Sequence, residues 1–198
     1  MARIPPIDES KSLPAAREEL ERQRQAHGRV TNMKRTLAHS PAALHALMQW
    51  YPLHDQVQQF LGERLATIFA HAVSTQSNCL ICSTFFRRLL IESGQDPDRP
   101  MLDPHAAAVV AYGRAIARDS NHMPSDVFDA VSALLSADQV VALTAFAAMM
   151  IATNVFNNAL EIDLDEYLYA YRKATITQPA VARYTELDGR AAGDDAAS

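Results

Sequence analysis

Residues 65–82 read LATIFAHAVSTQSNCLIC, and they decide the fold because they join a long apolar helix to the only two cysteines of the chain. The apolar positions leading into this stretch recur at spacings of one, three and four, which is the period of a buried helical face. These positions are Leu53, Val57, Phe60, Leu61, Leu65, Ile68, Phe69, Ala72 and Val73. Ser77 and Asn78 break the pattern, and either is a suitable cap for a new helix. We predict a helix over 53–75 and a second one from the cysteines to Gly94.

The rest of the chain carries further helix signals and no stretch that alternates at period two over the length of a strand. The start signals are prolines at the first helical position or capping side chains. They are Pro14, Ser40 with Pro41, Ser136 with Gln139, and Asp163. The fold class is therefore all-α, with roughly seven or eight helices in a single domain.

The chain divides into three parts by composition. Residues 1–27 form an N-terminal arm and a charged helix that Gly28 ends, residues 28–178 form the helical domain, and residues 179–198 form a polar tail that we expect to be flexible. The loop over 94–104 is the best internal boundary, but too little follows on each side to require separate domains.

Composition excludes several classes of function. The 198 residues include 18 basic and 23 acidic side chains and carry a net charge of −5, so no nucleic-acid partner is expected. The first twenty residues lack the apolar core of a secretory signal, and the apolar runs are too short to cross a bilayer. We expect a soluble, cytoplasmic protein with no membrane partner, in which a permanent disulfide is disfavoured.

Cys79 and Cys82 lie three positions apart. Residues at this spacing share one face of a helix, so the two sulfurs can form a disulfide that is easily made and broken. The start of a helix lowers the pKa of a thiol, which favours Cys79 as the nucleophile. The alternatives are inert packing of two small side chains or a zinc site, but zinc needs two further ligands that the sequence does not offer at suitable spacing. No metal or cofactor is predicted.

His71 is unusual because it stands in an apolar helix, where an imidazole needs a partner. Glu63 and Thr67 precede it by eight and four residues, so the three share a helical face and form a polar line toward the cysteines. The simpler alternative is a core histidine that hydrogen-bonds a backbone carbonyl.

Two further sets of polar residues are candidates for a role in a site. Asn154, Asn157 and Asn158 interrupt an apolar helix, and Arg87 and Arg88 suit a charged edge or the steering of a substrate.

The stretch 65–82 resembles the carboxymuconolactone decarboxylase and AhpD-like alkylhydroperoxidase superfamily. Ala72-Val73-Ser74 and Asn78-Cys79 with Cys82 match its motif, and the resemblance extends over about residues 28–170. It implies an AhpD-like helical bundle that assembles as a homo-oligomer. It also implies a dithiol peroxidase in which Cys82 reacts with a hydroperoxide, Cys79 resolves the product, and a thiol or dithiol reductant restores the pair.

The sequence departs from the family at both proton-relay positions. Thr67 stands where the family has glutamate, and Phe86 stands where it has histidine. We hypothesise that Glu63 and His71, one turn to either side of Thr67, replace them as catalytic residues. Two other functions stay open: a non-redox enzyme like carboxymuconolactone decarboxylase, and a helical oligomer that has lost catalysis and serves in binding or sensing.

Overall fold

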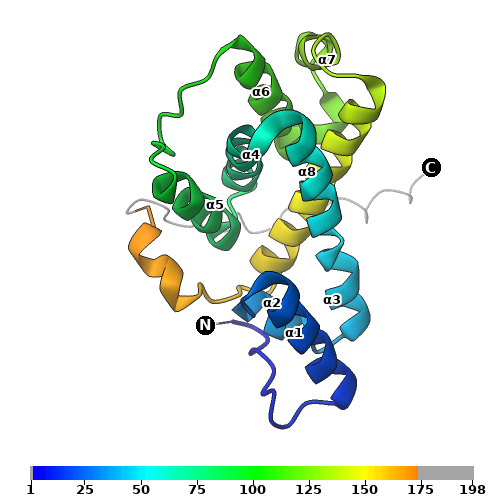
Figure 1. Ribbon diagram of the computed structural model, residues 1–198, viewed down its shortest axis with the longest axis vertical. Coiled ribbons are helices and arrows are strands. Elements are labelled where there is room, and N and C mark those ends of the chain that lie inside the picture. Colours follow the sequence, from blue (N-terminus) through cyan, green and yellow to red (C-terminus); the bar gives the residue numbers. More distant parts are fainter. Residues whose placement is uncertain (1, 174–198) are drawn as a thin grey trace, which may run out of the picture.

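The computed structural model describes residues 2–173, and within them the chain forms α-helices and short 3-10 helices without strands (Figure 1). The α-helices are α1 Pro14–His27, α2 Asn32–Leu37, α3 Pro41–Met48, α4 Trp50–Gln76, α5 Leu80–Glu92, α6 Pro104–Asp119, α7 Ser125–Ser132 and α8 Ala137–Ala159. The 3-10 helices are η1 Ser120–His122 and η2 Glu166–Tyr171. This confirms the all-α prediction. The predicted tail over 179–198 lies outside the described residues.

Helix α4 is the centre of the fold, with α5, α6 and α8 packed around it. Its second half is buried almost without interruption, because the apolar stripe of the sequence faces neighbours on several sides. Helix α6 approaches most closely at Gly113, where an added Cβ would lie 2.5 Å from the Phe69 ring. The main core, which includes Phe69 and both cysteines, is therefore built around α4.

A smaller core joins α1, α2 and α3. Leu20, Leu37 and Leu44 are its largest fully buried side chains. The N-terminal arm runs beside it, since the backbone N–H of Ile7 donates to the carbonyl of Arg35 at 3.3 Å. These first helices lie against one end of α8, next to the segment that leads to η2 (Figure 1).

Several predicted helix boundaries are confirmed. Ser40 caps α3 through its hydroxyl, Ser136 and Gln139 form the capping box of α8, and Gly28 ends α1 with a φ of 70°. Two predictions are wrong. Cys79 itself caps α5, in place of Ser77 or Asn78. The last segment is a 3-10 helix that follows Asp165, and the Asp163 side chain accepts the backbone N–H of Ala2.

The predicted single helix over 53–75 is bent. Gly62 adopts φ 75° and ψ 158°, a conformation that glycine tolerates and other residues rarely adopt. Figure 1 shows the chain changing direction between the two halves of α4. The bend places the first half of α4, which begins at Trp50, beside α8 and the cysteines.

Helix α8 is long and apolar enough to cross a membrane by length and composition alone, with a mean hydropathy of 1.7. The core helix of a soluble protein meets the same criterion. Here the inner face of α8 packs on α4, with Phe146 and Leu143 fully buried. The inner face accounts for part of this composition, while Val141 and Val155 of the same helix are exposed.

Candidate functional site

The two cysteines lie where the chain turns from α4 into α5. Asn78 makes the turn with a left-handed φ of 51°, which asparagine tolerates better than most residues. The N–H of Cys79 then donates to the carbonyl of Ser74 at 3.0 Å. Cys79 becomes the cap of α5, and its Sγ accepts the N–H of Cys82 at 3.5 Å. Both cysteines are free thiols and are buried.

Asn157 of α8 contacts both sulfurs. Its Nδ2 donates to Sγ of Cys82 at 3.3 Å and to Sγ of Cys79 at 3.8 Å. The Asn157 side chain is buried, and its Oδ1 has no hydrogen-bond partner among the described residues. A buried amide that directs its N–H groups at two sulfurs favours a negative charge on either of them.

The two thiols differ in acidity. The pKa of Cys79 lies below its ordinary value because its sulfur accepts hydrogen bonds from the Cys82 thiol, from backbone N–H groups of α5 and from Asn157, which together outweigh burial. The pKa of Cys82 lies well above its ordinary value, because its thiol donates to Cys79 and is buried. A single negative charge on the pair therefore rests on Cys79, at the helix start.

Cys82 lies in the wall of a cavity of about 420 Å³, a size that suits a small organic ligand. Aromatic side chains from α4, α5 and η2 form much of the wall. The lining includes the aromatic residues Trp50, Tyr51, Phe85, Phe86 and Tyr167 and the charged residues Arg29, Lys34, Arg88 and Asp165. Cys79 is not among the lining residues, so Cys82 is the thiol that a bound molecule meets.

The structure does not bring Glu63 and His71 to the thiols. Glu63 is exposed beside the bend of α4, and the Thr67 hydroxyl donates to the Glu63 carbonyl at 2.8 Å. His71 lies near the charges of Arg87 and Arg114, and burial together with these charges lowers its pKa to about 4. Within residues 2–173, neither side chain lines the cavity or donates to a sulfur. The relay stays a prediction that no described contact supports.

At the two positions where the family has its proton relay, this chain has one apolar side chain and one hydroxyl that is already hydrogen-bonded. Phe86 is 3% exposed and lines the cavity one helical turn after Cys82. The Thr67 hydroxyl already donates its hydrogen bond to a carbonyl of the preceding helical turn. Across the described chain, no cluster of three or more His, Cys, Asp or Glu side chains is arranged to hold a metal ion.

Sequence reasoning noticed some of these residues and missed others. Arg88 lines the cavity while it pairs with Glu92 at 2.9 Å, so the predicted charged edge and the site coincide. Asn157 was visible as a polar break in an apolar helix, but its sulfur partners were not. Lys34 and Tyr167 were missed, because a lysine in a polar stretch and a tyrosine near the end of the domain carry no signal of burial.

No family model and no curated protein matches the sequence. Solved structures do match in fold. The debrominase Bmp8 superposes with a TM-score of 0.70 at 16% identity over 85% of this chain and 95% of that one. The alkylhydroperoxidase AhpD core of a peroxidase-related protein from Ralstonia eutropha JMP134 gives 0.69 at 18% identity, over 85% and 94%. A variant of the debrominase bound to 2,3,4-tribromopyrrole gives 0.71 at 16% identity, over 85% and 94%. The chain therefore has the AhpD-like fold, which confirms the resemblance predicted from residues 65–82.

Proposed function

We propose that this protein is a thiol oxidoreductase of the AhpD-like superfamily that reduces organic hydroperoxides with Cys79 and Cys82. The observation that carries the proposal is the division between the two thiols. Cys82 lines the cavity, and beside it Cys79 caps the start of α5, where hydrogen bonds to its sulfur lower the pKa of its thiol. A pair that only filled the core would not need an amide directed at both sulfurs or a cavity next to one of them.

The first step begins with a thiolate on Cys79 and a thiol on Cys82. The Cys82 proton moves to Cys79 along the hydrogen bond between them, and the Cys82 sulfur attacks the terminal oxygen of R–O–OH. The O–O bond breaks, Cys82 becomes a sulfenic acid, and the leaving alkoxide takes a proton from solvent to become the alcohol, while Cys79 keeps the Cys82 proton as a thiol. The Asn157 amide contacts both sulfurs, so it stabilises the charge before and after the proton moves.

In the second step Cys79 attacks the sulfenic sulfur of Cys82. The S–S bond forms, the S–OH bond breaks, and the hydroxide leaves as water. The sum is two thiols and a hydroperoxide giving a disulfide, an alcohol and water. An external thiol or dithiol then reduces the disulfide by exchange. The protein, proposed to act in the cytoplasm as a homo-oligomer, thus depends on a partner reductant.

A second function has a specific observation in its favour. The cavity wall is rich in aromatic rings, and one structural neighbour is a debrominase crystallised with a bromopyrrole. Attack of the Cys82 sulfur on the halogen of an aromatic ring in the same cavity would break the carbon–halogen bond and leave the ring carbon to take a proton. Cys79 would then displace halide from the Cys82 sulfur, so that two thiols and the halogenated ring give a disulfide, the dehalogenated ring and hydrogen halide. This reading predicts reaction with halogenated aromatics and none with hydroperoxides.

The test is a single-turnover reaction of the fully reduced protein with cumene hydroperoxide. Free thiols are counted and the intact mass is followed over time, with Cys82→Ser and urea-unfolded protein as controls. Loss of both thiols with a mass decrease of two hydrogens, faster than in unfolded protein, supports the proposal. Thiols that survive longer than those of unfolded protein refute it; their loss with a halogenated aromatic then favours the second function, and inertness to both compounds favours a binding or sensing role.

A further inference from the structure

Lys34 is an unusual lysine because its side chain lies inside the protein. Only 3% of it is exposed, and it lines the same cavity as Cys82. Among the described residues its Nζ has one acceptor, the carbonyl of Arg29 at 3.4 Å, and no carboxylate lies within ion-pair distance. An ammonium group has three N–H donors, and burying it without a counter-charge is costly.

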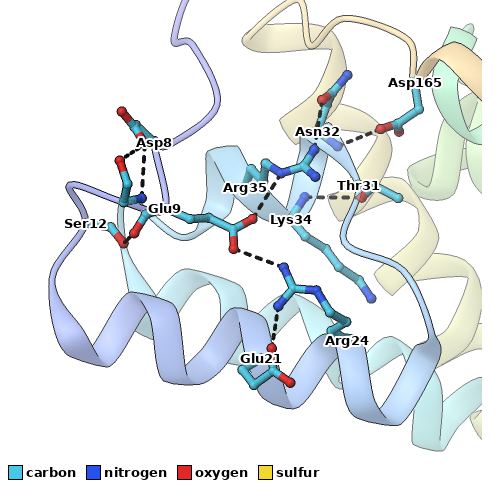
Figure 2. Close-up of polar contacts among 11 residues, drawn as sticks. Asp8, Glu9, Ser12, Glu21, Arg24, Thr31, Asn32, Lys34, Arg35 and Asp165 are labelled. Atoms are coloured by element: carbon cyan, nitrogen blue, oxygen red, sulfur yellow. Dashed lines mark hydrogen bonds and ion pairs between the residues drawn. The ribbon is translucent and has the colours of Figure 1, made fainter.

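The nearby acid does not serve as its partner. Asp165 also lines the cavity, but one of its oxygens accepts the backbone N–H of Asn32 at 2.9 Å. In Figure 2 the Lys34 side chain extends away from Asp165. Burial alone lowers the pKa of Lys34 to about 8, which is how a lysine without a close carboxylate behaves.

The other charges of the cavity are mostly positive. Arg29 lies with its guanidinium 3.8 Å from the centre of the Tyr167 ring, and Arg88 lies 5.5 Å from the same ring. Against Lys34 and these arginines the lining holds a single carboxylate, Asp165, while Arg88 also pairs with Glu92, which lies outside the lining. The pKa of Asp165 is raised because burial disfavours its charged form.

We propose that the cavity binds an apolar organic acid whose carboxylate accepts hydrogen bonds from Lys34, with its apolar body against the aromatic wall that leads to Cys82. The aromatic side chains supply the apolar contact, and the buried ammonium supplies the charge that selects the acid. That the bound acid is a substrate for Cys82 rests on the proposed function. That the cavity binds a carboxylate depends only on Lys34.

Binding can be measured without chemistry, because Trp50 is the only tryptophan of the chain and lines the cavity. Its fluorescence is followed as 4-phenylbutyrate or the neutral 4-phenylbutyramide is added. We expect the acid to bind at least about tenfold more tightly than the amide, as a charge-assisted hydrogen bond requires. Lys34→Met should abolish the difference. Lys11→Met, which removes an exposed lysine, should preserve it.

Equal binding of acid and amide to the wild-type protein would overturn the proposal, and this comparison needs no variant to fold. A preference that persists in Lys34→Met would overturn it as well. Thiol consumption is measured separately with linoleic acid hydroperoxide and its methyl ester. Selective binding of the acid with inert thiols refutes the peroxidase and keeps the anion site. Equal, fast reaction of acid and ester with no acid preference in binding keeps the peroxidase and refutes the site.

Discussion

The replacement Asn157→Leu separates the chemistry of the dithiol from its packing. The amide of Asn157 donates to both sulfurs at 3.3 and 3.8 Å, and leucine has nearly the same shape without the N–H groups. A hydrogen bond to a charged group contributes about 1.5–3 kcal/mol, and these long contacts to sulfur belong at the low end. Losing about 1.4 kcal/mol raises the apparent pKa of the reactive thiol by about one unit.

The assay is the pH dependence of alkylation by iodoacetamide, combined with the ultraviolet absorbance of the thiolate. We expect the midpoint to rise by about one unit and the rate near neutral pH to fall about tenfold. Stability should change little, because the Oδ1 atom of Asn157 is buried without a partner and an apolar side chain removes that cost.

The neighbouring Asn158 gives a matched control. It is exposed on the same helix and donates to the carbonyl of Ser77 at 3.1 Å, away from the sulfurs. Asn158→Ala should leave the alkylation profile unchanged. A second variant, Asn157→Asp, places a carboxylate beside the thiolate and should raise the midpoint further than leucine does. If Asn157→Leu leaves the midpoint where it was, the amide does not stabilise the thiolate and our account of the site is wrong.

Three further predictions follow from other contacts. In Cys79→Ser, hydroperoxide should leave a sulfenic acid on Cys82 that dimedone traps, formed more slowly than Cys82 is oxidised in the wild type because the base is gone, whereas Cys82→Ser should give no trapped adduct at the cavity; a dimedone adduct in Cys82→Ser and none in Cys79→Ser would reverse the assigned roles. The pKa of His71 is about 4 in the folded state and about 6.5 in the unfolded state, so the unfolded chain binds the proton first as the pH falls. The free energy of unfolding should therefore decrease as the pH drops between these two values, by up to about 3 kcal/mol. His71→Gln should remove that part of the loss in urea unfolding at neutral and acidic pH, and should leave alkylation unchanged; slower alkylation would restore the predicted relay. Gly113→Ala should lower the melting temperature, because its Cβ would lie 2.5 Å from the Phe69 ring and overpacking costs about 1–3 kcal/mol, more than the gain of about 1 kcal/mol in helix propensity; a higher melting temperature would show that the ring moves freely.

The helices were predictable from sequence because their signals are local. The apolar period of 53–75, the proline of α3 and the capping box of α8 each lie within a few residues of the feature they specify. The bend at Gly62 was missed for the same reason. The apolar spacing continues across it, from Leu61 to Leu65, as it would in a straight helix. Only the packing of the two halves against different neighbours reveals the bend.

The site was only half predictable, because its parts come from distant segments. The spacing of Cys79 and Cys82 identified the thiols within one turn of helix. Asn157 reaches them from α8, and Lys34 reaches the cavity from α2. Neither contact has a local pattern. Burial of Lys34 depends on distant segments such as the start of α4, where the Tyr51 ring centre lies 5.2 Å from Nζ, and no property of the residues next to Lys34 reports this.

The position of the charge also bears on how the dithiol works without the glutamate and histidine that the resemblance led us to expect. The helix dipole favoured Cys79 as nucleophile, and the resemblance favoured Cys82. These arguments conflict only if the thiol that ionises most easily must also attack. A thiolate on Cys79 that accepts the Cys82 proton is itself a base held against the attacking group, so a separate base is not required. For the proposed peroxidase reaction, we infer that the dithiol is its own proton relay. On this reading Thr67 and Phe86 do not mark lost catalysis, and Phe86 is free to form part of the apolar wall.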